Sequence, residues 1–532
     1  MPRRVVVLSG PVASGKSTLA QSLVDRFHFV RVRTHELIRT LKPEVPLERK
    51  PLQDAGEALD RDTGGTWLSR GLEARLAQEA EGVSVVVDSV RIKGQIDAVR
   101  DAYGPIVTHV HLTASVEDLA ERYRTRRSDL GEFPSYDAVR ADPTEAQVES
   151  LHSFADVVID TVRSSPEDVF ARVASRLRLY GAGVTQLVDI VVGGQYGSEG
   201  KGHIVSYLAP EYDVLVRVGG PNAGHTVYAV PDKEVFHHLP SGSTRAPNAL
   251  LVIGPGAALW LPELQAEVTR HEIEAGRLKI DPQAILIEPI DREREAALRK
   301  AIASTAQGVG QAAVRKILRT DAQPPVRLAR DEEALRPYIR PTAEVLDDAY
   351  AENRKILLEG TQGALLSIHH GSYPHVTSRD TTASGALAEA GIPPARVRKT
   401  VMVCRTYPIR VGGPSGPMGS ELSWKDIADR SEIALAELES TEITTTTKTQ
   451  RRVSEFSWSD IRRAAALNGP TDLALTFTDY LSSTNKDARR FEQLHSDTIR
   501  FIEELERVAT APVSLIATRF HYRSIIDRRQ WR

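Results

Sequence analysis

This sequence of 532 residues contains one cysteine, Cys404, three methionines and only 6% aromatic residues. A single cysteine excludes a disulfide within the chain, and a reducing compartment fits this composition. No apolar run approaches the ~20 residues that a membrane-spanning helix needs. The first residues lead into a strand pattern and not into the apolar core of a signal peptide. We therefore expect a cytoplasmic protein without a membrane partner.

An excess of charge of one sign is also absent. The 68 Lys and Arg residues are balanced by 71 Asp and Glu residues, which gives a net charge of −3. Nucleic acids attract proteins with a strongly basic field, so no nucleic-acid partner is expected. The hydrophobic share of 41% and the charged share of 26% are typical of a soluble globular protein. At this length we expect two or three domains.

What the sequence does contain is glycine in phosphate-binding patterns. A β-branched apolar run, 188–192, leads into the segment 193–202, in which five of ten residues are glycine and one is Lys201. Glycines after a strand let several backbone N–H groups point at one anion, and the lysine adds a full positive charge. The segment indicates a phosphate cradle, and a plain glycine-rich turn is the alternative.

Three further motifs follow in order along the chain. They are Gly-Gly-Pro-Asn-Ala-Gly-His-Thr at 219–226, Glu-Gly-Thr-Gln-Gly at 359–363 and Tyr-Pro-His-Val-Thr-Ser-Arg-Asp-Thr-Thr at 373–382. Together with the segment 193–202, in this order and spacing, they resemble the adenylosuccinate synthetase family. The likeness is closest to the shorter, archaeal type and its phage relatives, and it runs from Leu187 to the C-terminus.

The resemblance implies a ligase that forms a C–N bond. In this family a nucleoside triphosphate phosphorylates the 6-oxygen of a purine monophosphate, and the amine of L-aspartate then displaces that phosphate. The chemistry requires a base, cations around the moving phosphoryl group, an oxygen-lined Mg²⁺ site and a trap for the carboxylates of aspartate. The expected cofactor is Mg²⁺, and the expected partners are a purine nucleoside monophosphate, L-aspartate and ATP or GTP.

The motifs assign roles to individual residues by resemblance. Lys201 and His225 are expected to act on the moving phosphoryl group, and Gln362 to hold the 6-oxygen. Ser198 falls on the family's general base and, with the carbonyl of Gly224, on its Mg²⁺ ligands. The donor nucleotide is expected to be bound by Gly197, Glu199, Gly200, Gly202 and Asp479.

A second group is expected to bind the substrates. The family residues that grip the phosphate of the monophosphate correspond to Asn222, Thr305 and Thr377. L-Aspartate is expected at a loop rich in threonine and arginine, on Thr445, Thr446, Thr447, Arg451 and Arg452. Arg319 corresponds to an arginine that in the family reaches the nucleotide of the partner subunit, which implies a homodimer.

Two departures from the family pattern bear on the purine substrate. Ser198 stands where the family loop has an aspartate, so charge and volume are lost beside N1 and C2 of the purine. The related 2-aminoadenylosuccinate synthetases also have a small residue here and accept dGMP. Thr449 replaces an arginine that approaches the ribose 2′-hydroxyl, which agrees with a 2′-deoxy sugar. We predict dGMP as substrate and 2-aminoadenylosuccinate as product; IMP-dependent adenylosuccinate synthesis is the alternative.

Other departures leave choices open. The segment Thr476-Phe-Thr-Asp479 keeps the aspartate that reads guanine but lacks the family's lysine, so ATP and GTP are both candidate donors. His369 is a candidate for the missing base, and a hydrogen-bonded structural histidine is the other interpretation. The changes at Ser198 and Thr449 also allow a nucleotide-binding pseudoenzyme that regulates the N-terminal part.

The first third of the chain has its own phosphate-binding motif. Residues 10–17 have the spacing G-x-x-x-x-G-K-S between a strand pattern and a helix pattern. Lys16 would reach the β and γ phosphates and Ser17 would hold Mg²⁺. The expected nucleotide-binding residues are Gly10, Gly15, Lys16, Ser17 and Thr18. Asp88, at the end of a second apolar run, either orders the metal or caps the next turn.

This part resembles nucleoside and deoxynucleoside monophosphate kinases and dephospho-coenzyme A kinases. The resemblance implies a lid whose arginines neutralise the transferred group, and Arg124, Arg126 and Arg127 are the candidates; a solvated basic helix face is the alternative. A helix capped by Ser165 closes this part at about Leu179. We expect a second, kinase activity with an unspecified acceptor.

The boundaries follow from these patterns. We place a kinase-like domain at residues 1–180, a linker at 181–186 and a synthetase-like domain at 187–532. Strand and helix patterns alternate in both domains, which predicts an α/β fold with largely parallel sheets.

Overall fold

The computed structural model describes residues 3–125, 133–180, 184–228, 233–444, 449–521 and 523–531, and of residues 144 and 146 only the backbone. Two compact units, Met1–Ala182 and Gly183–Arg532, make up the chain. Both consist of helices on a largely parallel sheet, which confirms the predicted fold class. None of the helices in these ranges is both long and apolar enough to span a membrane.

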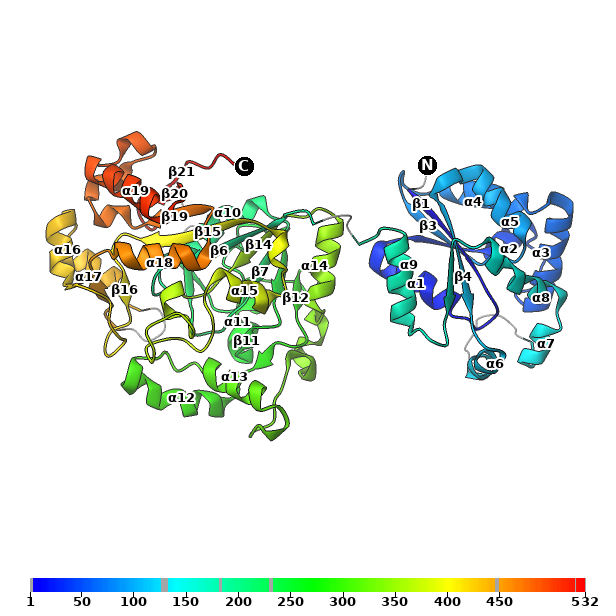
Figure 1. Cartoon of the computed structure of the whole chain (residues 1–532), viewed down its shortest axis with the longest axis horizontal. Helices are drawn as coiled ribbons and strands as arrows, with labels where there is room; N and C mark the ends of the chain where they lie inside the picture. Colours follow the sequence, from blue (N-terminus) through cyan, green and yellow to red (C-terminus); the bar gives the residue numbers. More distant parts are fainter. Residues whose placement is uncertain are drawn as a thin grey trace. The chain divides into compact units, whose positions relative to one another are not determined.

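The N-terminal unit has a five-stranded sheet in the order β2-β3-β1-β4-β5, in which all neighbouring strands are parallel (Figure 1). The strands are β1 (Arg4–Ser9), β2 (Val30–Arg33), β3 (Ser84–Asp88), β4 (Val107–Thr113) and β5 (Val157–Asp160). The helices are α1 (Lys16–Phe27), α2 (Thr34–Leu41), α3 (Arg49–Thr63), α4 (Thr66–Leu76), α5 (Lys93–Tyr103), α6 (Val116–Thr125), α7 (Tyr136–Arg140), α8 (Pro143–Ser150) and α9 (Pro166–Arg176).

Both faces of this sheet are covered. Val5 and Val7 of β1 pack with helices α2 to α5, and Val6 and Leu8 pack with α1 and α9. A strand buried on both faces has a nearly continuous apolar run, here residues 5–8, which is why the sequence predicts it well. The predicted N-cap Ser165 is confirmed by a capping box. The helix ends at Arg176 and not at Leu179, because the backbone turns left-handed two residues later.

The C-terminal unit has a nine-stranded sheet in the order β12-β10-β7-β14-β6-β15-β19-β20-β21. All neighbours are parallel except β20 and β21. Its strands are β6 (Val188–Gly193), β7 (Val214–Arg217), β10 (Leu250–Ile253), β12 (Leu278–Ile280), β14 (Ile356–Glu359), β15 (Val397–Arg405), β19 (Asp472–Thr476), β20 (Val513–Ala517) and β21 (Ile525–Asp527).

Smaller sheets and helices complete this unit. The short strands are β8 (His225–Tyr228), β9 (Lys233–Phe236), β11 (Ala258–Leu259), β13 (Ile285–Leu286), β16 (Ile409–Arg410), β17 (Glu421–Leu422) and β18 (Arg452–Ser454). The helices are α10 (Lys201–Leu208), α11 (Leu261–Arg270), α12 (Pro289–Ile302), α13 (Val309–Leu318), α14 (Thr342–Ala351), α15 (Ala383–Ala390), α16 (Trp424–Ser431), α17 (Leu435–Thr441), α18 (Trp458–Asn468) and α19 (Ser496–Ala509).

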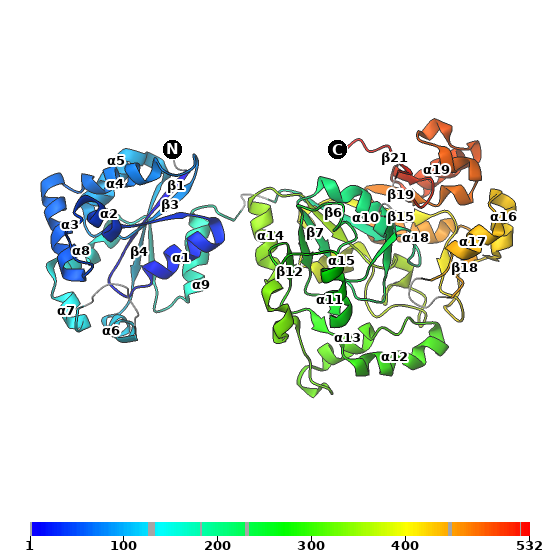
Figure 2. The ribbon, with the colours of Figure 1, turned by 180° about the vertical axis from the view of Figure 1, so that it is seen from behind.

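The central strand β6 positions the candidate site. Its residues Ile190 and Val192 pack toward α14, α15 and α18, and Val191 packs toward α10 and α11. Figures 1 and 2 show β6 and these helices from opposite sides. The neighbouring strands β7, β14, β15 and β19 run parallel to β6, so their carboxyl ends share one edge of the sheet. Ligands of open α/β sheets bind at this edge, and the predicted motifs follow these strand ends.

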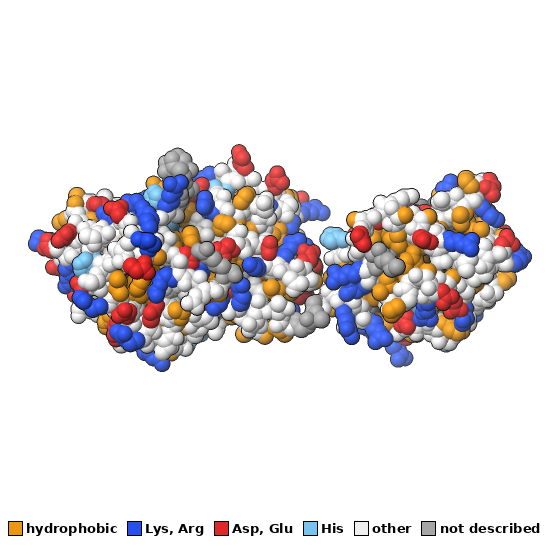
Figure 3. All heavy atoms as spheres, turned by 90° about the horizontal axis from the view of Figure 1, so that it is seen from above, with side chains coloured by type: hydrophobic (Ala, Val, Ile, Leu, Met, Phe, Trp, Pro, Cys, Tyr) orange, Lys and Arg blue, Asp and Glu red, His pale blue; other side chains and the backbone are white. Residues whose placement is uncertain are grey.

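The surface agrees with the charge balance of the sequence. On the face shown in Figure 3, basic and acidic side chains are interspersed over both units. The only cysteine of the chain, Cys404, is buried in β15.

Candidate active site

The loop between β6 and α10 closes around one buried carboxylate. The backbone turns through left-handed conformations at Gly197 (φ 88°) and Ser198 (φ 55°). Glu199 is fully buried, and its Oε1 accepts hydrogen bonds from the backbone N–H groups of Gln195 (3.0 Å) and Gly197 (2.8 Å). Lys201 Nζ donates to Glu199 Oε2 at 2.6 Å, and only 3% of this lysine is exposed. The predicted phosphate cradle is therefore a rigid turn with a buried ion pair at its centre.

Two glycines are required beside this ion pair. A Cβ atom on Gly193 would lie 2.7 Å from Glu199 Oε2, and one on Gly363 would overlap Oε1 of the same carboxylate. Any other residue would displace Glu199, because real Cβ atoms do not approach so closely. The glycines of two separate motifs thus both leave room for the carboxylate of Glu199.

Ser198 lies on the exposed rim of this loop. Its backbone carbonyl accepts a hydrogen bond from Arg405 Nη1 at 3.3 Å. Arg405 is itself buried, with Nη2 2.7 Å from Glu442 Oε1 and the guanidinium 4.0 Å from the ring centroid of Phe477. The loop is therefore held from the protein side, while its rim presents a hydroxyl and not a carboxylate.

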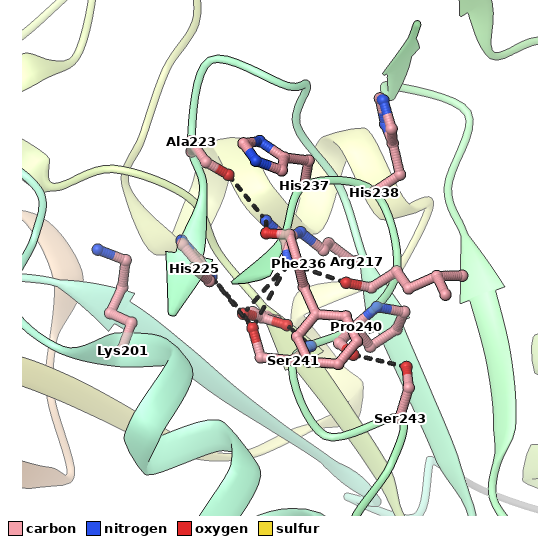
Figure 4. Close-up of polar contacts among 12 residues, drawn as sticks. Lys201, Arg217, Ala223, His225, Phe236, His237, His238, Pro240, Ser241 and Ser243 are labelled. Carbon is pink, nitrogen blue, oxygen red and sulfur yellow. Dashed lines mark hydrogen bonds and ion pairs between the residues drawn. The ribbon is translucent and has the colours of Figure 1, made fainter. Parts of the chain in front are cut away.

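A second buried cluster surrounds His225, the first residue of β8 (Figure 4). His225 Nδ1 is hydrogen-bonded to Glu359 Oε1, at the end of β14. The other oxygen of Glu359 accepts from the backbone N–H of Ser241 at 2.8 Å, and the Ser241 hydroxyl also donates to this carboxylate. Figure 4 shows His225, Ser241 and Arg217 directed toward one another, with Lys201 at the start of α10 beside them.

Arg217 supplies the positive charge of this cluster. Its guanidinium lies 3.7 Å from Glu359 Oε1 and is 2% exposed. Its Nη1 donates to the carbonyl of Leu239 (2.9 Å), and its Nη2 donates to the carbonyls of Ala223 (3.0 Å) and Phe236 (3.2 Å). Arg217 thus fixes the loop that leads into His225 as well as the carboxylate that binds it.

The electrostatics define the protonation states. Burial, with the charge of Arg217 second, lowers the pKa of His225 to about 4. Burial alone would raise the pKa of Glu359, but Arg217 and His225 outweigh it and lower that pKa to about 2. At neutral pH the pair is a carboxylate and a neutral imidazole. Because the carboxylate can only accept, Nδ1 carries the proton and Nε2 has the free lone pair.

Three predicted residues from different motifs come together nearby. Gln362 Nε2 donates to Thr377 Oγ1 at 3.0 Å, and Asn222 Nδ2 lies 3.5 Å from the same hydroxyl. Within the described residues, the buried oxygens Gln362 Oε1 and Asn222 Oδ1 have no hydrogen-bond partner. Buried polar atoms are normally paired, so two unpaired amide oxygens at one place indicate a site for hydrogen-bond donors of a ligand.

Asp479 lies in the turn Thr478–Tyr480 after β19 and is buried. Burial raises its pKa to about 7, and its Oδ1 has no partner in the described part of the chain. Thr476, at the end of the same strand, donates its hydroxyl to the carbonyl of Glu199 at 2.6 Å. This contact connects the Asp479 turn to the loop of Ser198.

The two arginines predicted to hold aspartate have different partners. Arg451 Nη1 donates to Glu442 Oε2 at 3.0 Å, so it shares a carboxylate with Arg405 behind the Ser198 loop. Arg452 Nε donates to Glu421 at 3.0 Å. The structure therefore links Arg451, and not Arg452, to the Ser198 loop. The predicted residues Thr445, Thr446 and Thr447 lie outside the described residues.

Three further candidates make local contacts or lie on the surface. Thr305 is half-buried, and its carbonyl accepts from Gln307 Nε2 at 3.1 Å. His369 is exposed, and its backbone N–H donates to Ser367 Oγ at 3.2 Å. Arg319 is exposed at the end of α13, next to Ile317, which is 73% exposed. The homodimer that Arg319 implies stays a prediction.

The predicted P-loop of the N-terminal unit has the expected form. Gly10 and Gly15 have φ values of 135° and 97°, and Lys16 Nζ donates to the carbonyls of Gly10 (2.7 Å) and Pro11 (2.6 Å). Ser17 Oγ donates to Asp88 Oδ2 at 3.1 Å. A nucleotide would draw the ammonium of Lys16 from these carbonyls to its phosphates.

The arginines of the predicted lid fall in different places. Arg124 is exposed and pairs with Glu121 at 2.6 Å, whereas Arg126 and Arg127 lie outside the described residues. Arg122, which the sequence did not single out, lines the pocket at the P-loop and donates to Thr161 Oγ1 at 2.8 Å. The helical spacing of Arg122 from the predicted arginines was the only signal for it.

No group of three or more His, Cys, Asp or Glu side chains that could hold a metal ion is found among the described residues. Mg²⁺ at phosphoryl-transfer sites takes many ligands from phosphates and water, so such a group is not required. Ser17 and Asp88 place a hydroxyl and a carboxylate side by side, which fits Mg²⁺ with a bound triphosphate. In the C-terminal unit the candidate donors are Ser198 and the carbonyl of Gly224.

Comparisons with known proteins agree with both halves of this description. A sequence model of the adenylosuccinate synthetase family matches residues 190–326 and 325–487, and a model of an AAA domain matches residues 5–156. The adenylosuccinate synthetase of Thermococcus onnurineus is 36% identical over 353 residues, 64% of this chain and 98% of the relative. That of Methanocaldococcus jannaschii is 36% identical over 350 residues, 64% and 96% of the two chains.

Two solved structures are similar over the same part. The adenylosuccinate synthetase of Plasmodium falciparum is 21% identical with a TM-score of 0.56, covers 64% of this chain and 100% of its own, and shows the fold alone. The succinoaminodeoxyadenylate synthetase of cyanophage S-2L, bound to dGMP and to dATP as an energy donor, is 28% identical with a TM-score of 0.54. It covers 65% of this chain and 96% of its own.

The family model covers more than half of the chain, and the archaeal relatives are matched over nearly their whole length. These matches confirm the resemblance predicted from the four motifs. The chain therefore belongs to the adenylosuccinate synthetase family of C–N bond-forming ligases, and its N-terminal part is a P-loop domain that matches the AAA-domain model.

Proposed function

We propose that the C-terminal unit condenses L-aspartate with C6 of dGMP and forms the deoxy monophosphate of 2-aminoadenylosuccinate. The observation that carries the proposal is Ser198, exposed on the rim of the phosphate loop where the family has an aspartate. A carboxylate here would crowd the 2-amino group of guanine, whereas a serine leaves room for it. The cyanophage enzyme with bound dGMP supports the same substrate, as does the loss of an arginine at Thr449.

In the first step, the 6-oxygen of the purine attacks the γ-phosphorus of the donor, and the bond to the β,γ-bridging oxygen breaks. The N1 proton leaves to a base other than Ser198, whose hydroxyl does not accept protons near neutral pH. Lys201 would stabilise the moving group with its charge, and His225 would do so as an imidazolium, because a neutral Nε2 has no proton to donate to a phosphate oxygen. Gln362 Oε1 and Asn222 Oδ1 have no partner among the described residues and can accept hydrogen bonds from a ligand. The donor phosphates would bring Mg²⁺, which neutralises their charge.

In the second step, the amine of L-aspartate adds to C6, and phosphate leaves with the former 6-oxygen. One of the aspartate carboxylates is a suitable partner for Arg451, which now binds Glu442. Glu442 also binds Arg405, and Arg405 binds the Ser198 loop. Binding of aspartate to Arg451 would therefore shift the loop that borders the purine site.

The test uses the full-length protein with Mg²⁺, L-aspartate and either ATP or GTP. Products from dGMP, GMP, IMP and dIMP are identified by mass. A succinyl adduct on dGMP and not on IMP is the expected result. An adduct on IMP alone would overturn the assignment of substrate, and no adduct on any purine would favour the pseudoenzyme.

Ser198→Asp should reverse the preference. We expect the ratio of kcat/KM for dGMP over IMP to fall by about 100-fold, since a carboxylate excludes the 2-amino group and restores the family's base. The control is Ser198→Ala, which removes the hydroxyl without adding volume and should keep the preference for dGMP. Equal ratios in the Asp and Ala variants would contradict this role of Ser198.

The donor site should depend on pH through Asp479. Because burial raises its pKa to about 7, this carboxyl is largely neutral at pH 6 and ionised at pH 8. Only the carboxylate can accept from both N1–H and the 2-amino group of guanine. The KM for GTP is therefore expected to fall up to about tenfold from pH 6 to pH 8. Asp479→Asn should make that KM independent of pH, and a wild-type KM that rises with pH would contradict the assignment.

A further inference from the structure

The N-terminal unit contains a pocket of about 500 Å³ that the ligase reaction does not require. One end is formed by the P-loop, with Lys16, Ser17 and Asp88. The rest of the lining includes Arg49, Gln53 and Asp60 of α3, Trp67 of α4, and Arg91 just before α5. A pocket of this size accommodates a small ligand next to the transferable phosphate of a bound triphosphate.

The far end of the pocket is organised by a carboxylate behind its wall. Glu145, on α8, is buried and does not line the pocket. Arg91 pairs with Glu145, Gln53 Nε2 donates to its Oε1 at 3.0 Å, and Arg49 Nη1 lies 4.0 Å away. One carboxylate thus orients two guanidinium groups that face the pocket, which leaves a net positive charge for an anion.

The whole lining favours an anionic ligand. Six cationic side chains line the pocket against three carboxylates. One of these carboxylates, Asp88, is held by Arg31 at 2.6 Å and by Ser17 at 3.1 Å. Both contacts occupy oxygen Oδ2 of the carboxylate that could otherwise take up a proton. An acceptor with a neutral hydroxyl would need a base at this end, whereas a phosphate oxygen carries its negative charge already.

A second feature indicates a group with N–H donors. Gln53 is 6% exposed, and its Oε1 has no hydrogen-bond partner among the described residues. Near it on the lining, Asp60 accepts from Trp67 Nε1 at 2.6 Å and from Gln95 Nε2 at 3.0 Å. An unpaired acceptor, a carboxylate and an indole ring suit a flat heterocycle that bears N–H groups.

We propose that this pocket is the acceptor site of a second phosphoryl transferase, and that the acceptor is a nucleoside monophosphate whose phosphate is held by Arg49 and Arg91. An oxygen of that phosphate attacks the γ-phosphorus of the triphosphate at the P-loop, and the bond to the β,γ-bridging oxygen breaks. Two nucleoside diphosphates result. No proton acceptor is needed, because a phosphate monoester is mostly dianionic at pH 7.

The test supplies full-length protein with ATP and Mg²⁺ but no aspartate. The candidate acceptors are dGMP, dAMP, dCMP and dTMP, with the four nucleosides and D-gluconate as hydroxyl acceptors. Diphosphates are resolved by anion-exchange chromatography. We expect a diphosphate from at least one monophosphate and no product from the hydroxyl acceptors. Transfer to a hydroxyl acceptor alone, or to none of these compounds, overturns the proposal.

Single substitutions test whether Arg49, Arg91 and Gln53 form the acceptor site. Arg49→Ala and Arg91→Ala should each raise the KM for the monophosphate by about 30-fold or more, with the KM for ATP within about twofold of wild type. Arg100→Ala on the outside of α5, where Arg100 pairs with Asp156, is the matched control. Gln53→Glu keeps both arginines and should raise the same KM through charge repulsion. An unchanged acceptor KM in all three pocket variants overturns the assignment.

The phosphoryl transfer in the N-terminal unit and the ligation in the C-terminal unit should be independent of each other. Lys16→Ala should abolish diphosphate formation and leave aspartate ligation intact, and Lys201→Met should do the reverse. Loss of both activities in either variant would contradict two independent sites.

Discussion

Replacing Lys201 with methionine is expected to lower the kcat of ligation by about a thousandfold. Lys201 is the first residue of α10, so its ammonium stands at the positive end of the helix, where a phosphate would bind. No other lysine belongs to the loop 193–202. Initial rates with dGMP, aspartate and a triphosphate measure the loss.

Lys201→Met is also expected to lower the unfolding free energy, and this loss has to be distinguished from a loss of catalysis. Without Lys201, the carboxylate of Glu199 stays buried with only two backbone N–H donors, which is expected to cost about 3–5 kcal/mol. The double variant Glu199→Gln with Lys201→Met removes both charges, so it should recover most of the unfolding free energy. If it also recovers ligation, the role of Lys201 is structural. Lys425→Met, at an exposed lysine, is the control.

Apolar runs accounted for most of what the sequence predicted about the fold. Strands such as β1 and β6 are buried on both faces, so most residues in them are apolar and the pattern is clear. The glycine motifs come directly after these strands in the sequence, so they were expected at the edge where the carboxyl ends of the strands lie. The order of the nine strands could not be predicted, because β14 inserts between β6 and β7 from far along the chain.

The sequence predicted which motifs contain functional charged residues, but it did not predict the ion-pair partners of those residues. Glu359 was part of a recognised motif, but its contact with His225 spans 134 residues and leaves no local pattern. Arg217 left a signal that went unused, since it is the one charged residue of the buried strand β7. Arg451 and Arg452 look equivalent in sequence. They bind different carboxylates because neighbouring residues at a strand point to opposite sides.

Helix geometry explains why two arginines of the basic cluster in the N-terminal unit differ in their surroundings. Arg122 and Arg124 are two residues apart on α6, so their side chains leave the helix in nearly opposite directions. Arg122 reaches the pocket, and Arg124 faces solvent beside Glu121. A basic cluster in sequence therefore contributed one residue to the site and one to the surface.

Glu359→Gln is expected to reduce the kcat of ligation by about 100- to 1000-fold. The carboxylate of Glu359 holds Nδ1–H of His225, so Nε2 is the nitrogen left to contact a bound phosphate. A glutamine amide can donate as well as accept, so it no longer selects this tautomer. Ser241→Ala is the matched control, because it removes one donor to Glu359 and keeps the carboxylate. We expect less than about a tenfold loss in that variant.

The stability of the glutamine variant shows whether the carboxylate does more than hold the fold. Arg217 would lose its counter-charge, so the unfolding free energy at pH 7 should fall by about 3–5 kcal/mol. The pKa of Glu359 is lowered to about 2, so its carboxylate stabilises the fold above about pH 4.3, and this contribution is lost as the pH falls toward 2. The difference between wild type and variant should therefore shrink below pH 4. If kcat is unchanged while this difference is present, Glu359 acts on stability alone; if both change, it also positions His225.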